Sequence, residues 1–196
     1  MQIPSILRFC LGMARHPTQI RLRLRELLRI GASPPREKPV PRNHLPSVTL
    51  VKVTASDTSD AARLVDMYAR NPSPFLSGPT THEALEKALL KGIEYYLVLN
   101  EAGNAVAAQA FNPKTSQSFQ SLTDFSFRGR GYQISATSTF AALKAREGYR
   151  ELWGNVMRSN TRQQRAFESQ GWELMAHPEH EDLIRVRLTL KDPEEE

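Results

Sequence analysis

The sequence predicts one α/β domain, in which helices flank a mixed, mainly antiparallel, twisted sheet. Two observations lead to this prediction. Two strand-like runs, residues 93–100 and 105–111, are joined by a short turn with a glycine at its third position, which is typical of an antiparallel hairpin. Between Thr123 and Trp172, a glycine turn, a helical run, an extended run and a polar helix follow one another, which is the order of a strand–helix–strand unit.

The composition is that of a globular domain. The chain has 196 residues, of which 40% are hydrophobic and 24% charged. No run of residues approaches the length of a membrane span, and the apolar start lacks a small-residue cleavage site. The single cysteine, Cys10, excludes internal disulfides and all-cysteine metal sites. We therefore expect a cytoplasmic protein in a reducing compartment, with membrane association through the N-terminal arm as an alternative.

The positive charge is concentrated at the N-terminus. Residues 1–42 hold nine Lys/Arg and two Asp/Glu, a net charge of +7, whereas the whole chain carries +5, so the rest carries −2. We expect a basic amphipathic arm at 1–32, a Pro-rich linker at 33–47, the domain at 48–190 and an acidic tail at 191–196. The arm fits three roles: a helix packing on its own domain or a protein partner, a helix binding an anionic membrane surface or nucleic acid, or an organelle presequence.

Local patterns predict the elements of the domain in order. Ser56–Asp60 carries capping residues for a first helix, and Thr80 with Glu83 forms a capping box for a second helix that runs through Lys91. An alanine-rich helix follows the glycine turn and ends near Gly148, and a polar helix follows Asn160. The predicted extended runs are residues 48–54, 93–100, 105–111, 114–122, 125–127, 151–157, 173–176 and 183–190.

The turn Arg128-Gly129-Arg130-Gly131-Tyr132-Gln133 is the strongest functional signal. Glycines at this spacing let the backbone turn sharply and expose successive amide N–H groups, and the following helix adds the positive end of its dipole. Such a turn suits a pyrophosphate. It lacks the Gly-Lys-Ser/Thr ending of a nucleoside-triphosphate loop and the third glycine of a dinucleotide fold.

The wider order of elements resembles the GNAT acyltransferase family over about residues 48–190. That family carries the pattern Gln/Arg-x-x-Gly-x-Gly/Ala, which Arg128 to Gly131 match, while Gln133 replaces the final small residue. Further matches are Gly148, Val156 and Asn160. The family closes its next helix with Tyr-x-x-x-Gly-Phe, and here Phe167 and Gly171-Trp172 stand at these positions.

The resemblance implies binding of acetyl-coenzyme A or a related acyl-coenzyme A and transfer of the acyl group to a primary amine of a small molecule or a protein. It implies a strand amide near Thr123 that polarises the thioester carbonyl, and Asp124 is the candidate base. The implied cofactor-binding residues are Leu122, Thr123, Arg128, Gly129, Arg130, Gly131, Tyr132, Gln133, Asn160 and Phe167.

Two departures from the family pattern leave a second function open. Phe167 stands where family members commonly have the tyrosine that protonates the leaving thiolate, and Gln133 brings a long side chain to the phosphate turn. The alternative is a catalytically impaired GNAT-like module that binds or scaffolds through its basic arm. His177 and His180 lie among acidic residues, yet no third ligand accompanies them, so we predict a solvated turn and no metal site.

Overall fold

The structure is a computed structural model and describes residues 45–72 and 78–191. The predicted basic arm, most of the Pro-rich linker and nearly all of the acidic tail lie outside the described residues, so these assignments stay predictions. Residues 73–77 also lie outside the described ranges. No helix in the described ranges is long and apolar enough to cross a membrane.

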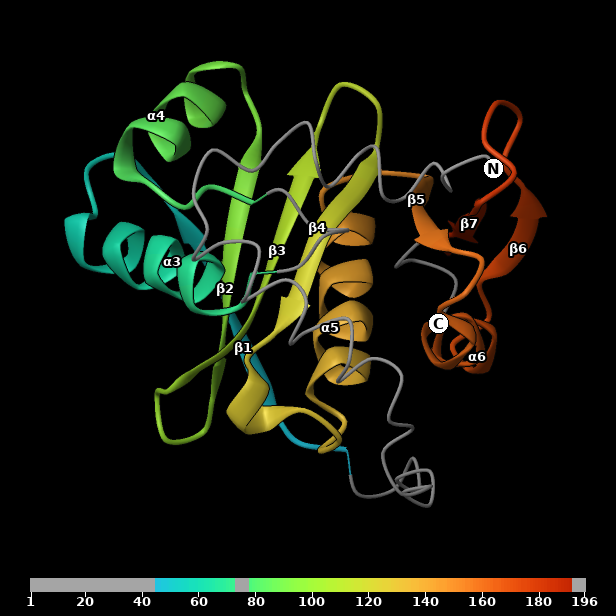
Figure 1. The fold of residues 1–196 in the computed structure, drawn as a ribbon, viewed down its shortest axis with the longest axis horizontal. Helices are drawn as coiled ribbons and strands as arrows, with labels where there is room; N and C mark the ends of the chain where they lie inside the picture. Colours follow the sequence, from blue (N-terminus) through green and yellow to red (C-terminus); the bar gives the residue numbers. More distant parts are fainter. Residues whose placement is uncertain (1–44, 73–77, 192–196) are drawn as a thin grey trace, which may run out of the picture. The chain divides into compact units, whose positions relative to one another are not determined.

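The domain is built on one seven-stranded sheet with the strand order β1-β2-β3-β4-β5-β7-β6 (Figure 1). Neighbouring strands run antiparallel, except that β4 and β5 are parallel. The predicted fold class is therefore confirmed. The strands are β1 Val48–Val53, β2 Glu94–Asn100, β3 Ala105–Asn112, β4 Gln117–Thr123, β5 Glu151–Met157, β6 Glu173–Ala176 and β7 Leu183–Thr189.

Within the described residues, four α-helices and one 3-10 turn accompany the sheet, and capping residues explain where the helices begin. Asp57 caps α3 by accepting a hydrogen bond from the amide of Asp60. Thr81 caps α4 by accepting one from the amide of Ala84, so the predicted cap at Thr80 is wrong by one residue. The elements are α3 Thr58–Arg70, α4 His82–Leu90, η2 Phe125–Phe127, α5 Tyr132–Arg146 and α6 Thr161–Ser169.

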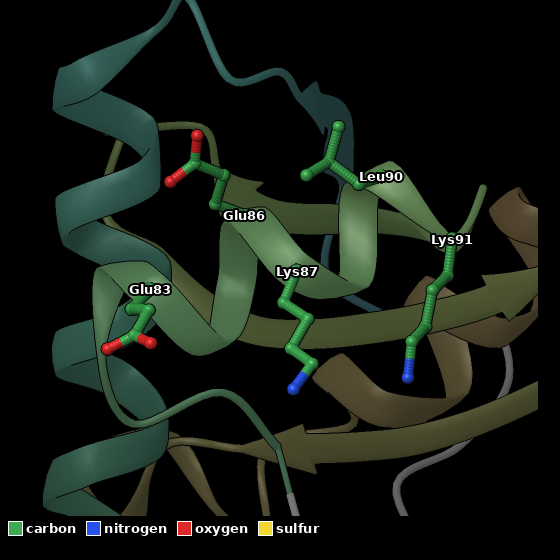
Figure 2. Close-up of a pocket in the computed structure, with 5 residues that line it drawn as sticks. All are labelled: Glu83, Glu86, Lys87, Leu90 and Lys91. Atoms are coloured by element: carbon green, nitrogen blue, oxygen red, sulfur yellow. The ribbon is translucent and has the colours of Figure 1, made fainter.

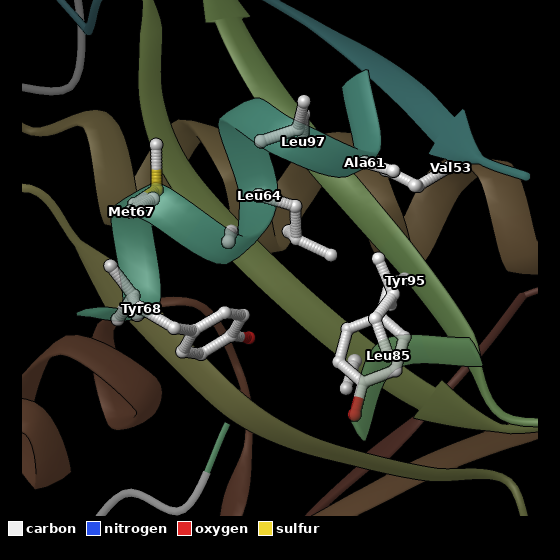
Figure 3. Close-up of a cluster of buried hydrophobic side chains, with 11 residues drawn as sticks. Val53, Ala61, Leu64, Met67, Tyr68, Leu85, Tyr95 and Leu97 are labelled. Carbon is white, nitrogen blue, oxygen red and sulfur yellow. The ribbon is translucent and has the colours of Figure 1, made fainter. Parts of the chain in front are cut away.

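The first four strands are covered on both faces. Alternation along β2 sends Tyr95 and Leu97 into the cluster under α3 and α4, shown in Figure 3. Tyr96 and Val98 point the other way, into the clusters under α5. Burial on both faces explains why β2 and β3 have nearly continuous apolar sequences rather than alternating ones.

The last three strands, β5, β6 and β7, are different, because the described helices cover only one of their two faces. Side chains of β5 and β7 pack with α5 and α6 in a cluster that includes Leu152, Val156, Val186, Phe167 and Trp172. The cluster that α3 and α4 bury contains no residue of β5, β6 or β7. In Figure 1 these strands lie on the right, apart from the β1–β4 half.

The chain leaves the sheet before it reaches the glycine turn. The sequence predicts an extended run at Phe125–Phe127, but the structure has the 3-10 turn η2 there. Asp124 causes the difference: its carboxylate accepts a hydrogen bond from the amide of Ser126 at 2.9 Å, and its carbonyl accepts one from the amide of Phe127 at 2.9 Å. This turn carries the chain from the end of β4 to Arg128.

Candidate functional site

The parallel strands β4 and β5 pair at one end and part at the other. Their register has the single partner pair Gln117 and Trp153, and the amide of Trp153 donates to the carbonyl of Ser116 at 3.2 Å. We call the diverging segments, Phe119–Thr123 and Gly154–Met157, the β4–β5 fork. Gly154 permits the close approach at its base, because a Cβ there would lie 2.7 Å from the carbonyl oxygen of Ser118.

Backbone polar groups border the fork on both sides. The amide of Asp124 donates to Val106 of β3 at 3.0 Å, so alternation turns the amides and carbonyls of Ser121 and Thr123 toward β5. On β5, the amide of Trp153 faces β4, so alternation turns those of Asn155 and Met157 the same way. A fork bordered in this manner suits an extended ligand with amide groups of its own.

A kink in β4 shapes one side of the fork. Gln120 has a φ of 51°, which is uncommon for a residue with a side chain, and the β3–β4 register shifts beside it, between Ala108 and Ala110. Two phenol hydroxyls hold the kink: Tyr68 donates to the backbone carbonyl of Gln120 at 2.6 Å, and Tyr95 donates to its side-chain oxygen at 2.9 Å. Sequence reasoning missed this feature, because a glutamine in a polar strand gives no signal of a positive φ.

Burial keeps both hydroxyls protonated. It raises the pKa of Tyr68 well above its ordinary value and the pKa of Tyr95 to about 12. The two rings meet edge to face with centroids 6.3 Å apart. Both tyrosines are therefore hydrogen-bond donors throughout the physiological pH range.

The glycine turn presents unpaired amides at the start of α5. Gly129 and Gly131 have φ values of 82° and 83°, which L side chains rarely adopt. None of the described residues accepts a hydrogen bond from the backbone amides of residues 129–133, whereas the amides of Ile134 and Ser135 donate to the carbonyl of Gly131. The turn and the helix dipole together provide a site for an anion.

Side-chain bonds tie the glycine turn to the end of β4. The Nε of Arg128 donates to the carbonyl of Thr123 at 3.1 Å, while its guanidinium stacks 3.6 Å from the ring centroid of Phe125. The hydroxyl of Thr123 donates to the side-chain oxygen of Gln133 at 2.9 Å. The long side chain of Gln133 is thus directed to β4, and the amides of the turn stay uncovered by it. The structure brings Thr123, Arg128 and Gln133 together, and their contacts with a cofactor stay predictions.

Of two further predicted site residues, Leu122 is buried in the core and Tyr132 is partly buried. Leu122 is buried in the cluster under α3 and α4, and its backbone faces β3, so neither its side chain nor its backbone groups face β5 across the fork. Tyr132 packs edge to face on Phe127 at 5.8 Å, and the guanidinium of Arg130 lies 5.6 Å from the Phe127 ring. Arg130 is itself part of the glycine turn, and its side chain is exposed.

The side chain of Asp124, the candidate base, is buried. Its carboxylate accepts from Ser126, from the amide group of Asn71 at 3.3 Å and from Arg70 at 3.4 Å. Burial by itself raises the pKa of Asp124, but the hydrogen bonds and the charge of Arg70 outweigh it and leave the pKa below its ordinary value. The carboxylate stabilises the end of β4, and its predicted role as base is disfavoured by these bonds.

Asn160 and Phe167 lie beyond the other side of the fork, on α6. Asn160 caps this helix by accepting from the amide of Gln163 at 3.2 Å, and its own amide group donates to the Gln163 side chain. Phe167 packs on Trp172 with ring centroids 4.9 Å apart, in the cluster between α6 and the sheet. Their predicted contacts with a cofactor stay predictions.

The far end of α5 holds a buried cation. The side chain of Lys144 is fully buried and donates to Glu94 at 2.7 Å, to the hydroxyl of Tyr96 at 2.9 Å and to Glu147 at 2.7 Å. Its ammonium also lies 4.3 Å from the ring centroid of Phe111. Glu94 additionally pairs with Lys52. Nothing in the sequence pattern distinguishes Lys144 from the other cations of this helix.

Other candidate features show no chemistry of their own. His177 accepts from the amides of Glu179 and His180, and across residues 45–72 and 78–191 no group of three metal-ligating side chains gathers. A hollow of about 500 Å³ lies on α4, lined by Glu83, Glu86, Lys87, Leu90 and Lys91. Figure 2 shows that these side chains do not converge on one point, so the hollow gives no polar site.

Comparisons with known proteins identify the fold. No protein-family model and no curated relative matches the sequence. Among solved structures, a domain from Methanocaldococcus jannaschii is 15% identical, with a TM-score of 0.59 over 74% of this chain and 99% of that one. Spermidine N-acetyltransferase from Vibrio cholerae is 12% identical, with a TM-score of 0.56 over 73% and 94%.

The ribosomal-protein N-acetyltransferase RimL, solved in complex with coenzyme A, is 15% identical, with a TM-score of 0.56 over 74% of this chain and 94% of that one. Several of the structural neighbours are thus N-acetyltransferases that act on amines, and one was solved with coenzyme A. Identities at this level establish the architecture alone. The described part of this chain has the GNAT fold.

Proposed function

We propose that the domain is an acyl-coenzyme A-dependent N-acyltransferase that transfers an acetyl or related acyl group to a primary amine. The observation that carries this proposal is that two sets of backbone groups meet at Thr123. One set borders the β4–β5 fork, and the other is the run of amides at residues 129–133. Arg128 and Gln133 join the two sets through Thr123.

The residues present fit an acyl-coenzyme A. The glycine turn offers amides for a pyrophosphate, and the two positive-φ glycines let a phosphate approach the backbone without meeting a Cβ. The fork offers the backbone amide and carbonyl of Ser121 and the amide of Thr123 for an amide-containing arm. Because Gln133 bonds to Thr123, it leaves the turn open and fixes the strand end beside it.

The bound coenzyme would supply a thioester, whose carbonyl is open to attack by an amine. The chain supplies position and polarisation: a backbone amide of the fork near Thr123 donates to the carbonyl oxygen as negative charge develops there. Gln120, held by Tyr68 and Tyr95, keeps this part of β4 in its kinked form. Phe167 has no proton to give to the departing thiolate, so we expect a slower reaction than in members with tyrosine there, by about a hundredfold to ten-thousandfold.

Isothermal titration calorimetry with acetyl-coenzyme A tests the binding step. We expect one site per chain and a dissociation constant in the micromolar range, and desulfo-coenzyme A should bind similarly because the turn and the fork contact groups that it shares. No heat of binding at millimolar acetyl-coenzyme A, with the folded state checked by circular dichroism, would refute the proposal.

A non-catalytic module that has kept the fold is the second candidate, and Phe167 is the observation that favours it. Its ring packs on Trp172, so a tyrosine ring in Phe167→Tyr should keep the same position and add a hydroxyl there. We expect amine-dependent thiol release by the native protein to rise at least tenfold in Phe167→Tyr. Coenzyme binding without thiol release in either protein, over a broad panel of amines, would favour the module.

A further inference from the structure

Arg185 lies in the middle of β7, next to the candidate site. Its neighbours Ile184 and Val186 pack into the cluster under α6, so alternation places Arg185 on the opposite face, which no described helix cluster covers. In the sheet it lies opposite Asn155 of β5, a residue whose backbone borders the fork. Arg185 is therefore one strand away from the proposed position of the thioester.

An aromatic platform fixes the guanidinium of Arg185. The guanidinium lies 4.8 Å from the ring centroid of Trp153. Trp153 precedes Gly154 in β5, and its side chain is on the same face of the sheet as Arg185. The indole N–H of Trp153 donates to the carbonyl of Thr115 at 2.6 Å, so the ring itself is held. A stacked, planar guanidinium of this kind loses little freedom when it binds a planar anion.

The neighbouring arginines have acceptors, whereas Arg185 has none among the described residues. Arg187 lies on the same face and pairs with Glu173 at 2.7 Å. Arg158 donates through its Nε to the carbonyl of Glu181 at 2.7 Å. The Nε of Arg185 is shielded from solvent and has no hydrogen-bond partner. Leaving a charged donor desolvated and unpaired is unfavourable, so the position is suited to an anionic ligand that supplies the missing acceptor.

We propose that Arg185 binds the carboxylate of the acceptor, and that the acceptor is a small molecule carrying both an amine and a carboxylate. The inference rests on the proposed function, because it takes the fork as the place where the amine reacts. A guanidinium matches a carboxylate through two parallel hydrogen bonds, which fixes the orientation of the bound acid.

The charges of this face argue against a polyamine acceptor. A polyamine needs free carboxylates, but the two carboxylates on this face of the described strands, Glu151 and Glu173, both act on Arg187. Arg185 instead lies opposite Asn155 on one side and Met175 on the other, which are uncharged. The acceptor thus differs in class from spermidine, the substrate named for one structural neighbour.

Matched pairs of amines test the inference on the full-length protein. The pairs are 4-aminobutyrate with propylamine, lysine with cadaverine, and phenylalanine with phenethylamine, and each pair differs by one carboxylate. Binding to the coenzyme A-loaded protein is measured by saturation-transfer NMR and turnover by thiol release. The variants are Arg185→Gln and Arg185→Lys, with Arg187→Gln as the matched control on the same strand and face.

We expect the native protein to prefer at least one acid over its carboxylate-free partner. Arg185→Gln should weaken that acid about tenfold to a hundredfold and leave the carboxylate-free amine unchanged, and Arg185→Lys should restore part of the loss. Arg187→Gln should behave as the native protein. The absence of an acid preference, or an equal loss in both glutamine variants, would overturn the inference.

The two proposals fail in different ways. Acid binding that depends on Arg185, without thiol release from any amine, would support the carboxylate site and count against acyl transfer. Thiol release that is equal for each acid and its carboxylate-free partner, and unaffected for both by Arg185→Gln, would support acyl transfer and refute the carboxylate site.

Discussion

The two ends of α5 are built in opposite ways. At its C-terminal end, Lys144 is fully buried, and its contacts are internal: two carboxylates, a phenol hydroxyl and four aromatic rings. At its N-terminal end, the amides of residues 129–133 have no acceptor among the described residues. The polar groups at the C-terminal end have hydrogen-bond partners, whereas the backbone donors at the N-terminal end have no acceptor among the described residues.

This difference separates stability from binding along a single helix. The lysine also lies in the last turn, where a cation interacts favourably with the helix dipole. Because the C-terminal end is anchored to β2 through Glu94 and Tyr96, the N-terminal end can remain unsatisfied and keep its position. A change at one end should therefore alter the unfolding free energy, and a change at the other should alter ligand affinity.

Replacing Lys144 should have the largest effect on stability. Lys144→Met removes the partner of two carboxylates and leaves Glu94 and Tyr96 half-satisfied, so we expect the free energy of unfolding to fall by about 3–5 kcal/mol. Urea denaturation measures this change. Arg146→Met, an exposed cation on the same helix, should stay within about 0.5 kcal/mol of the native protein. An unfolding free energy that is the same in both variants would contradict the anchoring role.

Two glycines at the ends of α5 form a matched pair for the next prediction. Gly131 and Gly148 have φ values of 83° and 86°, so alanine at either site should cost about 1–2 kcal/mol of stability. Gly131→Ala should also weaken acetyl-coenzyme A at least tenfold, because the amides of the turn shift, whereas Gly148→Ala should leave the affinity unchanged. Calorimetry on both variants decides, and equal affinities would show that the turn does not bind the ligand.

The bond between Thr123 and Gln133 should have a smaller effect. Thr123→Val removes a hydroxyl that donates at 2.9 Å, which should cost about 0.5–1.5 kcal/mol of stability. It also frees Gln133 to lie across the turn, so the affinity for acetyl-coenzyme A should fall a few-fold. Thr123→Ser keeps the hydroxyl and should restore both quantities. Failure of serine to restore them would assign the loss to packing instead.

The smallest expected effect is a loss of unfolding free energy at acidic pH through Glu94, which anchors the C-terminal end of α5. Burial alone raises the pKa of Glu94, but hydrogen bonds from Lys144, Lys52 and Tyr96 outweigh it, so the pKa lies below its ordinary value of 4.5. A lowered carboxylate pKa stabilises the fold above the pKa of the unfolded state, and this contribution is lost as the pH falls through the lowered value. In urea denaturation from pH 6 to pH 3, the unfolding free energy should fall less in Glu94→Gln than in the native protein.

Most of the fold could be predicted from the sequence, because the local patterns agree with one another. The hairpin turn at residues 101–104, the double-sided burial of β2 and β3 and the glycine turn are all written in residue type and spacing. The extended prediction for Phe125–Phe127 was wrong, because the capping carboxylate of Asp124 overrode the β propensity of two phenylalanines.

The site was only partly predictable. Arg128, Gly129 and Gly131 carry a pattern that is local in the sequence, so their position at the start of α5 followed from it. Arg185 and Trp153, which are 32 positions apart, meet through the pairing of β7 with β5. Tyr68 and Gln120, which are 52 positions apart, meet where α3 packs on the kinked strand β4. Contacts of this kind depend on register and on a strand kink, and no periodicity in a single segment specifies them.

The kink at Gln120 has a consequence for kinetics. A positive φ at a residue with a side chain costs on the order of 1–3 kcal/mol, and the hydroxyls of Tyr68 and Tyr95 stabilise it before any ligand arrives. Because the kinked shape of β4 is already formed in the free protein, binding requires no conformational change of this strand. Stopped-flow mixing with the coenzyme should therefore give a single relaxation whose rate rises linearly with ligand concentration.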